Sequence, residues 1–173
     1  MIDVLIVGGG PAGLSAALLL GRCRRRVLIC DAGQPRNAAA RVFNGYLSRD
    51  ASSPSEFLEI GRKELQRYET VEFRHAVVRD VEREDKHFVG LLQSGERVAT
   101  RMVLFASGVV DELPAIDGLR QFYGSTVHSC PFCDGWECRD QAIAVAGGDQ
   151  AAADLAIELR QWSKESSCAP TGL

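Results

Sequence analysis

The order of apolar and polar positions along the chain predicts an α/β protein. Short β-branched runs, typical of buried strands, alternate with longer stretches that carry small and apolar residues at helical spacing. A turn at Ser94-Gly95 joins two of the runs as a hairpin. The predicted strands are residues 3–7, 27–30, 71–73, 76–81, 88–93, 96–99, 101–106 and 142–146, and the predicted helices are residues 14–20, 57–68 and 151–162.

Segments rich in polar residues and helix breakers divide this pattern. Residues 33–55 are polar, contain several turn formers and are predicted to be mostly loop, and residues 113–118 are rich in Pro and Gly. We therefore expect a first domain over residues 1–117 and the beginning of a second over residues 118–173. Residues 166–172 match neither a strand nor a helix cap.

Composition and charge narrow the class of protein. Of the 173 residues, 46% are hydrophobic and 25% are charged, a balance that excludes wholesale disorder. The formal net charge is −3, so the positive surface that a nucleic-acid-binding protein needs is missing. No apolar run approaches the roughly 18 residues that a membrane span requires. We expect a cytoplasmic protein with neither nucleic-acid nor membrane partners.

The first motif with a chemical meaning is Gly8-x-Gly10-x-x-Gly13, between the first predicted strand and the first predicted helix. The first glycine permits a tight turn, the second lets the backbone approach a pyrophosphate, and the third lets the helix pack closely on the strand. The N–H groups at the helix start would bind phosphate, and Asp31, after the second strand, would accept hydrogen bonds from a ribose. The pattern predicts a dinucleotide site, and a glycine-rich turn in another α/β protein is the alternative.

The second motif is the pair Cys130 and Cys133, followed directly by Asp134. A Cys-x-x-Cys pair in a cytosolic protein indicates redox or metal chemistry, and a helix start lowers the pKa of a thiol. Asp134, or His128 before the pair, could transfer a proton to or from a departing thiolate. The alternatives are a zinc site made by His128, Cys130, Cys133 and Cys138, or inert thiols. We favour redox chemistry because no second Cys-x-x-Cys is present.

Taken together, residues 4–13, 106–118 and 130–135 resemble the two-domain flavin disulfide reductases of the thioredoxin reductase type, in order and in spacing. The Cys-Pro-Phe-Cys-Asp-Gly-Trp form, with residues 43–50, is closer to the thioredoxin reductase-like branch that includes dithiol oxidases of small natural products. The resemblance implies a three-layer, Rossmann-like FAD-binding domain followed by a second nucleotide-binding domain. It also implies FAD and NADPH as cofactors and a thioredoxin-like protein or a small dithiol or disulfide as partner.

The resemblance assigns individual residues as well. It implies that Cys130 and Cys133 are the redox pair, with Asp134 as the acid. The implied FAD contacts are Gly8, Gly10, Pro11, Ala12 and Gly13 at the pyrophosphate, Asp31, Ala32, Gln34 and Arg36 on the adenosine side, Asn44 near the flavin, the backbone near Val77 at the adenine, and Ala106, Ser107 and Gly108 closing over the cofactor.

The chain also departs from this family. In the second glycine loop, residues 147–152, Asp149 stands at the second glycine position counted from Gly147, and no arginine cluster for an NADPH 2′-phosphate follows. From the resemblance we also expect that the last segment of the FAD-binding domain is not among these residues. We therefore expect a truncated chain, with a frameshift after about Lys164 as one hypothesis that sequencing the gene tests. An incomplete fold exposes sheet edges and apolar surface, so we also expect a homodimer.

Three functions follow from these expectations. The first is a flavin-dependent thiol–disulfide oxidoreductase that passes electrons between FAD and the Cys-x-x-Cys disulfide. The second is an FAD- and O₂-dependent dithiol oxidase of small molecules. The third is a non-catalytic remnant of such an enzyme.

Overall fold

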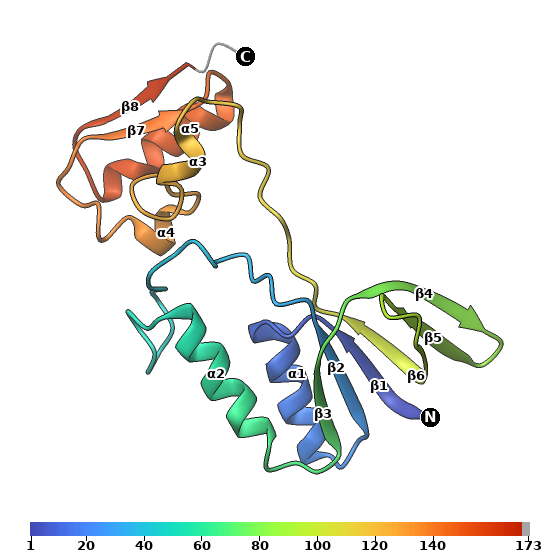
Figure 1. The fold of residues 1–173 in the computed structure, drawn as a ribbon. Coiled ribbons are helices and arrows are strands. Elements are labelled where there is room, and N and C mark those ends of the chain that lie inside the picture. Colours follow the sequence, from blue (N-terminus) through green and yellow to red (C-terminus); the bar gives the residue numbers. More distant parts are fainter. Residues whose placement is uncertain (171–173) are drawn as a thin grey trace. The chain divides into compact units, whose positions relative to one another are not determined.

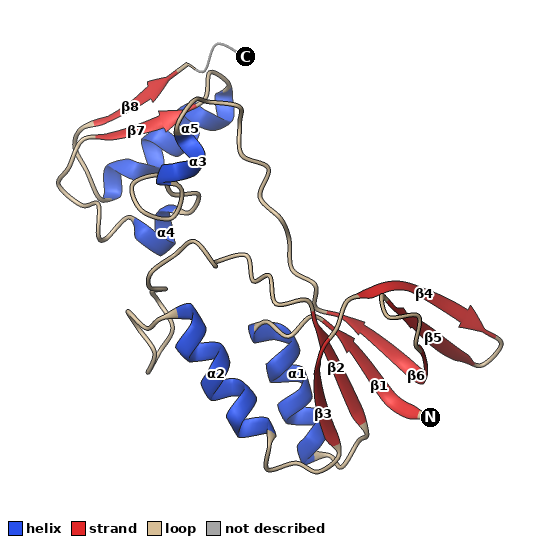
Figure 2. Cartoon of the chain, viewed as in Figure 1, coloured by secondary structure: helices blue, strands red, loops and turns tan. Residues whose placement is uncertain are grey.

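The computed structural model describes residues 1–170, which form two compact units (Figures 1 and 2). Unit 1 consists of residues 1–38 and 53–111, and unit 2 consists of residues 39–52 and the chain from residue 112 onward. The two units are described separately below. The division at residue 117 that the sequence suggests stays a prediction.

Unit 1 is built on a mixed sheet with the strand order β3-β2-β1-β6-β5-β4 (Figure 1). The first four of these strands run parallel, while β5 pairs antiparallel with both β6 and β4. The strands are β1 (Ile2–Val7), β2 (Val27–Asp31), β3 (Val71–His75), β4 (Val78–Glu84), β5 (His87–Leu92) and β6 (Arg97–Phe105).

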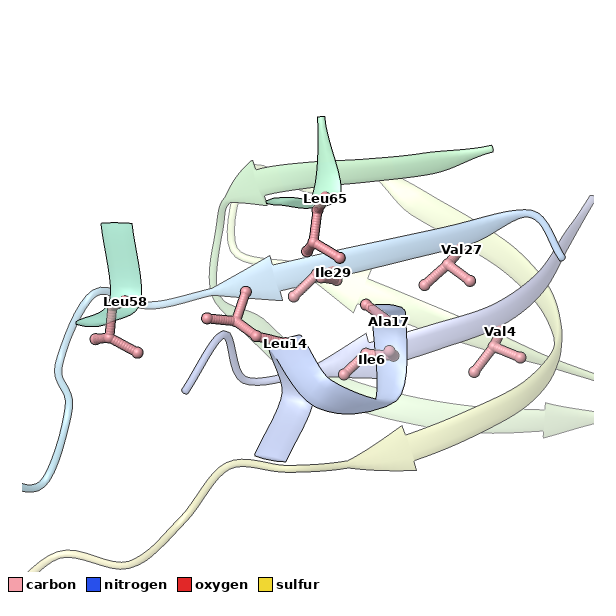
Figure 3. Close-up of a cluster of buried hydrophobic side chains, with 8 residues drawn as sticks. All are labelled: Val4, Ile6, Leu14, Ala17, Val27, Ile29, Leu58 and Leu65. Carbon is pink, nitrogen blue, oxygen red and sulfur yellow. The ribbon is translucent and has the colours of Figure 1, made fainter. Parts of the chain in front are cut away.

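Two helices, α1 (Pro11–Arg22) and α2 (Pro54–Leu65), cover one face of this sheet (Figure 2). Both begin with proline at the first turn, where its missing N–H costs no hydrogen bond. The core between the helices and the sheet is apolar, and each fully buried Leu, Ile or Val contributes about 1.5–3 kcal/mol. Its buried members are Val4, Ile6, Leu14, Ala17, Val27, Ile29, Leu58 and Leu65 (Figure 3).

The opposite face of the parallel strands is covered by the antiparallel part of the same sheet. Leu5 and Leu28 form a second core there with Leu92 and Val98. A Cβ placed on Gly90 of β5 would lie only 2.5 Å from Cδ2 of Leu5 in β1. In a flat sheet these two strands would stand about 10 Å apart, so the sheet curls over and forms a third layer. The predicted α/β class with three layers is confirmed.

The predicted break between two strands at residue 100 is wrong. Residues 96–99 and 101–106 are predicted to be two strands, but they form the single strand β6. Thr100, which is completely buried, is the crossing point: it pairs with Phe88 of β5 on one side and with Ile2 of β1 on the other. A single strand can serve both partners because it has two hydrogen-bonding edges: residues 97–100 pair antiparallel with β5, and residues 100–105 pair parallel with β1.

Unit 2 contains a small parallel β-α-β arrangement. Strands β7 (Ile143–Ala146) and β8 (Ser166–Ala169) pair in parallel, and the helix α5 (Gln150–Glu158) with the short 3₁₀ helix η1 (Leu159–Gln161) packs on them. Asp149 caps α5 by accepting a hydrogen bond from the amide of Ala152 at 2.9 Å. Two four-residue helices, α3 (Leu119–Phe122) and α4 (Pro131–Asp134), precede this arrangement.

The prediction that residues 166–172 contain no strand is wrong, since β8 occupies residues 166–169. Residues 166–169 include no β-branched or aromatic side chain of the kind enriched in strands, but the backbone groups that β7 offers decide the conformation here. Residues 171 and 172 of that segment lie outside the described residues. Within residues 1–170, no helix has the length and apolarity that crossing a bilayer demands.

Candidate functional site

The glycine-rich turn after β1 is shaped by contacts of the backbone with itself. Gly8 has φ +109° and donates its amide hydrogen to the carbonyl of Cys30 at 2.8 Å. A Cβ on Gly8 would overlap the carbonyl oxygen of Ala106, and a Cβ on Gly13 would overlap the carbonyl oxygen of Gly8. Both positions therefore require glycine before any ligand is considered.

Gly10 has a different reason to be glycine. A Cβ there would meet no protein atom within 4 Å. Gly10 is also the N-cap of α1, and no side chain caps this helix. The first-turn amides of α1 and its positive dipole end therefore face open space beside a residue without a side chain, which fits an approaching pyrophosphate.

Asp31, at the end of β2, is held by three donors. Its Oδ1 accepts hydrogen bonds from the amides of Gly9, at 3.3 Å, and Gly33, at 3.2 Å. Its Oδ2 accepts a hydrogen bond from Nη2 of Arg62 at 3.0 Å, and the carboxylate side chain is only 12% exposed. A Cβ on Gly9 would lie 2.7 Å from the Cβ of Asp31, so Gly9 also makes room for this side chain.

Sequence reasoning missed Gly9, Gly33 and Arg62. For Gly9 the sequence did hold a signal. The motif requires glycine at Gly8 and Gly10 but not between them, so a third glycine there needs a reason of its own. Arg62 stands 31 residues from Asp31 and had no signal in the sequence.

The segment that follows β6 lies beside the glycine turn. The amide of Ala106 donates a hydrogen bond to the carbonyl of Val7 at 2.8 Å, and the amide nitrogen of Ser107 lies 3.0 Å from a Cβ built on Gly8. Gly108 then adopts φ +67°. The structure thus brings the predicted residues 8–13 and 106–107 together at the carboxyl ends of the parallel strands, where nucleotides bind in such sheets.

The remaining predicted adenosine contacts lie at the same edge. The amide of Ala76 donates a hydrogen bond to the carbonyl of Asp31 at 3.0 Å, which places the backbone next to Val77 beside β2. Ala32 and Gln34 follow β2 directly. Arg36 forms a bidentate ion pair with Asp111, with Nη2 to Oδ1 at 2.7 Å and Nε to Oδ2 at 2.9 Å. Asp111 was not predicted.

In unit 2, Cys130 and Cys133 form a disulfide with their Cα atoms 5.3 Å apart. Cys130 is the N-cap of α4, and its carbonyl accepts hydrogen bonds from the amides of Cys133, at 3.2 Å, and Asp134, at 3.3 Å. Asn44, which was predicted to lie near a flavin, donates a hydrogen bond from Nδ2 to the carbonyl of Cys133 at 3.0 Å.

Two titratable side chains beside the disulfide contact each other. Nδ1 of His128 lies 3.4 Å from Oδ1 of Asp134, and both side chains are partly buried. Burial and the charge of Asp134 raise the pKa of the nearby Cys138 thiol. Cys138 is therefore held as a thiol and is not a ready nucleophile.

The disulfide bears directly on the zinc alternative. It bonds the sulfur atoms of Cys130 and Cys133 to each other, so neither is a thiolate ligand in this structure. Among the residues that the structure describes, no group of three or more His, Cys, Asp or Glu side chains is arranged to hold a metal ion. The geometry of Cys130 and Cys133 therefore favours the redox interpretation over the zinc site.

Exposed aromatic side chains flank the disulfide. Phe132, inside α4, is 73% exposed and makes an edge-on contact with Trp162 at 5.6 Å between ring centroids. Trp136 is 65% exposed, and the guanidinium carbon of Arg139 lies 4.3 Å from its ring centroid. Two exposed aromatic side chains therefore stand within three residues of the disulfide in the chain.

Comparison with known proteins assigns the family. The family model described as pyridine nucleotide-disulphide oxidoreductase matches residues 2–168. The chain belongs to this family. The probable thioredoxin reductase of Arthroderma benhamiae is 34% identical over 169 residues, covering 94% of this chain and 42% of the relative. The thioredoxin reductase sirT of Leptosphaeria maculans is 38% identical over 147 residues, covering 83% of this chain and 45% of the relative.

Solved structures of the family agree with this assignment. HlmI is 43% identical with a TM-score of 0.90, and 98% of this chain covers 54% of that chain. An oxidoreductase from Agrobacterium tumefaciens is 37% identical with a TM-score of 0.91, covering 96% of this chain and 56% of the other. The chain spans about half the length of the curated relatives it matches.

These comparisons confirm the predicted resemblance to flavoprotein oxidoreductases of the thioredoxin reductase type and the predicted fold class. The roles of the individual site residues, from Gly8 to Asp134, stay predictions.

Proposed function

We propose that this chain supplies the FAD-binding turn and the redox disulfide of a flavin-dependent thiol–disulfide oxidoreductase of the thioredoxin reductase type. The single observation that carries the proposal is the disulfide between Cys130 and Cys133 in a chain whose first βαβ unit fits a dinucleotide. The thioredoxin reductases among the relatives point the same way.

The residues of the glycine turn fit FAD. The open space over Gly10 and the uncapped start of α1 would receive the pyrophosphate, and Asp31 would accept a hydrogen bond from the adenosine ribose. When bound, FAD supplies two-electron exchange with the disulfide on one side and with a nicotinamide or oxygen on the other. NADPH as the electron donor is part of the proposal.

The side chains around the disulfide would handle the protons. Breaking the sulfur–sulfur bond takes two electrons and leaves two thiolates, which bind two protons to become thiols. Asp134 and His128 are paired at 3.4 Å and adjoin the disulfide, so one can hold a proton while the other stabilises the resulting charge.

The reduced pair then exchanges with a partner. One thiolate attacks the disulfide of a thioredoxin-like protein or a small molecule and forms a mixed disulfide, which the second thiolate resolves. The partner leaves as a dithiol, and the disulfide between Cys130 and Cys133 forms again. The homodimer and the cytoplasmic location expected from the sequence stay predictions.

Flavin absorbance and turnover test this proposal. The purified chain should take up FAD and, with NADPH, reduce a chromogenic disulfide. Cys130→Ser and Cys133→Ser should each abolish turnover but keep the flavin. Cys23→Ser is the matched control, because this free cysteine is exposed in unit 1. A colourless chain that takes up no added FAD would contradict the proposal and leave the non-catalytic remnant.

The exposed rings of Phe132 and Trp136 favour a second candidate, a dithiol oxidase. A small apolar dithiol could pack on them while it exchanges with the disulfide, and its two electrons and two protons would reduce O₂ to hydrogen peroxide by way of FAD. This candidate predicts oxygen consumption with a small dithiol and no nicotinamide. Phe132→Ser should then raise KM for the dithiol more than it lowers kcat.

A further inference from the structure

The Arg62 side chain on α2 lies in an unusual place for a cation. Its Nη2 donates a hydrogen bond to Oδ2 of Asp31 at 3.0 Å, and its guanidinium carbon lies 4.9 Å from the ring centroid of Phe73 in β3. Its Nε is buried without a hydrogen-bond partner among residues 1–170. A buried donor without a partner is rare in folded proteins, so the contacts with Asp31 and Phe73 must account for the position of this side chain.

We propose that Arg62 is a positioning residue that restricts Asp31 to a single hydrogen bond from the cofactor's adenosine ribose. The proposal rests on the proposed function, because it presumes that FAD binds at the glycine turn. It adds a specificity determinant that neither the motif nor the family assignment contains.

The argument begins with the acceptor capacity of the carboxylate. An ionised carboxylate offers about four acceptor positions, two on each oxygen. The amides of Gly9 and Gly33 occupy both positions on Oδ1 of Asp31. Arg62 occupies one position on Oδ2, which leaves one position for a ligand. A carboxylate with free positions on both oxygens has the capacity to accept hydrogen bonds from both vicinal hydroxyls of a ribose.

The surroundings keep the carboxylate from turning to free a second position. Gly9 packs against it so closely that a Cβ there would lie 2.7 Å from Cγ of Asp31. The guanidinium of Arg62 is itself held over the ring of Phe73, with its central carbon 4.9 Å from the ring centroid. The remaining acceptor position therefore points in one fixed direction, and only one of the two ribose hydroxyls can occupy it.

Adenosine diphosphate (ADP) and its 2′- and 3′-deoxy analogues test whether Asp31 has one free acceptor position, since they carry the adenosine ribose without the flavin. In calorimetric titrations of the full chain, one deoxy analogue, either the 2′ or the 3′, should bind with the same affinity as ADP. The other should bind about tenfold more weakly, because it lacks the one hydrogen bond to a charged acceptor. In Arg62→Met the freed position on Oδ2 accepts the second hydroxyl, so both analogues should bind about tenfold more weakly than ADP.

Two further variants separate positioning from structure. Arg62→Lys keeps a charged donor for Oδ2 and should restore the single-hydroxyl pattern, even though its ammonium lacks the planar fork. Lys63→Met is the matched control, because it removes an exposed cation from the next position of α2. It should leave the analogue pattern of the original chain unchanged.

The outcomes are distinct. Equal weakening of both deoxy analogues in the original chain, or an unchanged pattern in Arg62→Met, overturns the proposal while FAD binding stands. No binding of ADP or of FAD by the folded original chain overturns the proposed function and this proposal with it. If Arg62→Met does not fold, the affinities measured with the original chain and with Arg62→Lys still test the proposal. In each of these two proteins one deoxy analogue must bind as tightly as ADP and the other more weakly.

Discussion

Alanine placed at Gly10 and at Gly13 should separate binding from folding, although the two positions are three residues apart in one motif. At Gly10 the new methyl group meets no protein atom within 4 Å, and the backbone angles, φ −75° and ψ −175°, suit alanine. At Gly13 the methyl group would overlap the carbonyl oxygen of Gly8 and lie 3.3 Å from Cγ2 of Ile6.

The expected magnitudes follow from these contacts. Gly10→Ala replaces a favourable N-cap by an unfavourable one, which costs about 1 kcal/mol of folding stability or less. Its methyl group would stand where a pyrophosphate approaches, and overpacking of about 1–3 kcal/mol weakens FAD binding roughly five- to 150-fold. Gly13→Ala must push α1 away from β1, which costs about 3 kcal/mol and lowers Tm by about 6–12 °C.

Two measurements on the same three proteins check this. Thermal unfolding followed by circular dichroism without FAD reports the folding term, and quenching of flavin fluorescence reports FAD affinity. Gly10→Ala should lose affinity at nearly unchanged Tm, and Gly13→Ala should lose Tm. If Gly10→Ala binds FAD with the same affinity as the original chain, the proposed placement of the pyrophosphate over Gly10 is refuted. An unchanged Tm for Gly13→Ala would refute the packing argument.

Two more predictions concern folding alone. Leu5→Ala removes a completely buried side chain from beneath Gly90 and should lower the free energy of unfolding by about 2–5 kcal/mol in urea titrations. Met102→Ala removes a side chain of β6 that is 64% exposed and should change the free energy of unfolding by less than about 0.5 kcal/mol, and equal losses in the two variants would contradict the third layer. The hydrogen bond from the amide of Arg26 lowers the pKa of Asp3, so its stabilisation is present above the pKa of the unfolded chain and is lost as pH falls through the folded pKa. Asp3→Asn should therefore be less stable at neutral pH, with a gap that closes on acidification; a gap that widens would show the opposite sign.

Local sequence was sufficient to predict those features that depend only on residues close together in the chain. The spacing of Gly8, Gly10 and Gly13 between a strand and a helix gave the turn, because its sterics involve backbone only a few residues away. The helix predicted over residues 57–68 corresponds to α2, although α2 begins three residues earlier, at Pro54, and ends at Leu65. The pair Cys130 and Cys133 could be read as a possible disulfide because their spacing allows one.

Pairing between distant segments could not be read from the sequence. Strand β6 is continuous because Thr100 pairs with β5 and β1 at once, and β8 is a strand because β7 offers its backbone. Neither fact is encoded in the residues of the strand itself, since the N–H and C=O groups that pair two strands belong to the backbone and are common to all residues except proline.

The same division applies to the candidate site. The sequence by itself determined which turn suits a pyrophosphate and that Asp31 ends the second strand beside it. Only the tertiary structure decided that Arg62 from α2 holds Asp31 and that Asp111 holds Arg36. Each of these ion pairs joins side chains far apart in the chain, so its formation depends on how helices and loops pack against the sheet, which local residue patterns do not specify.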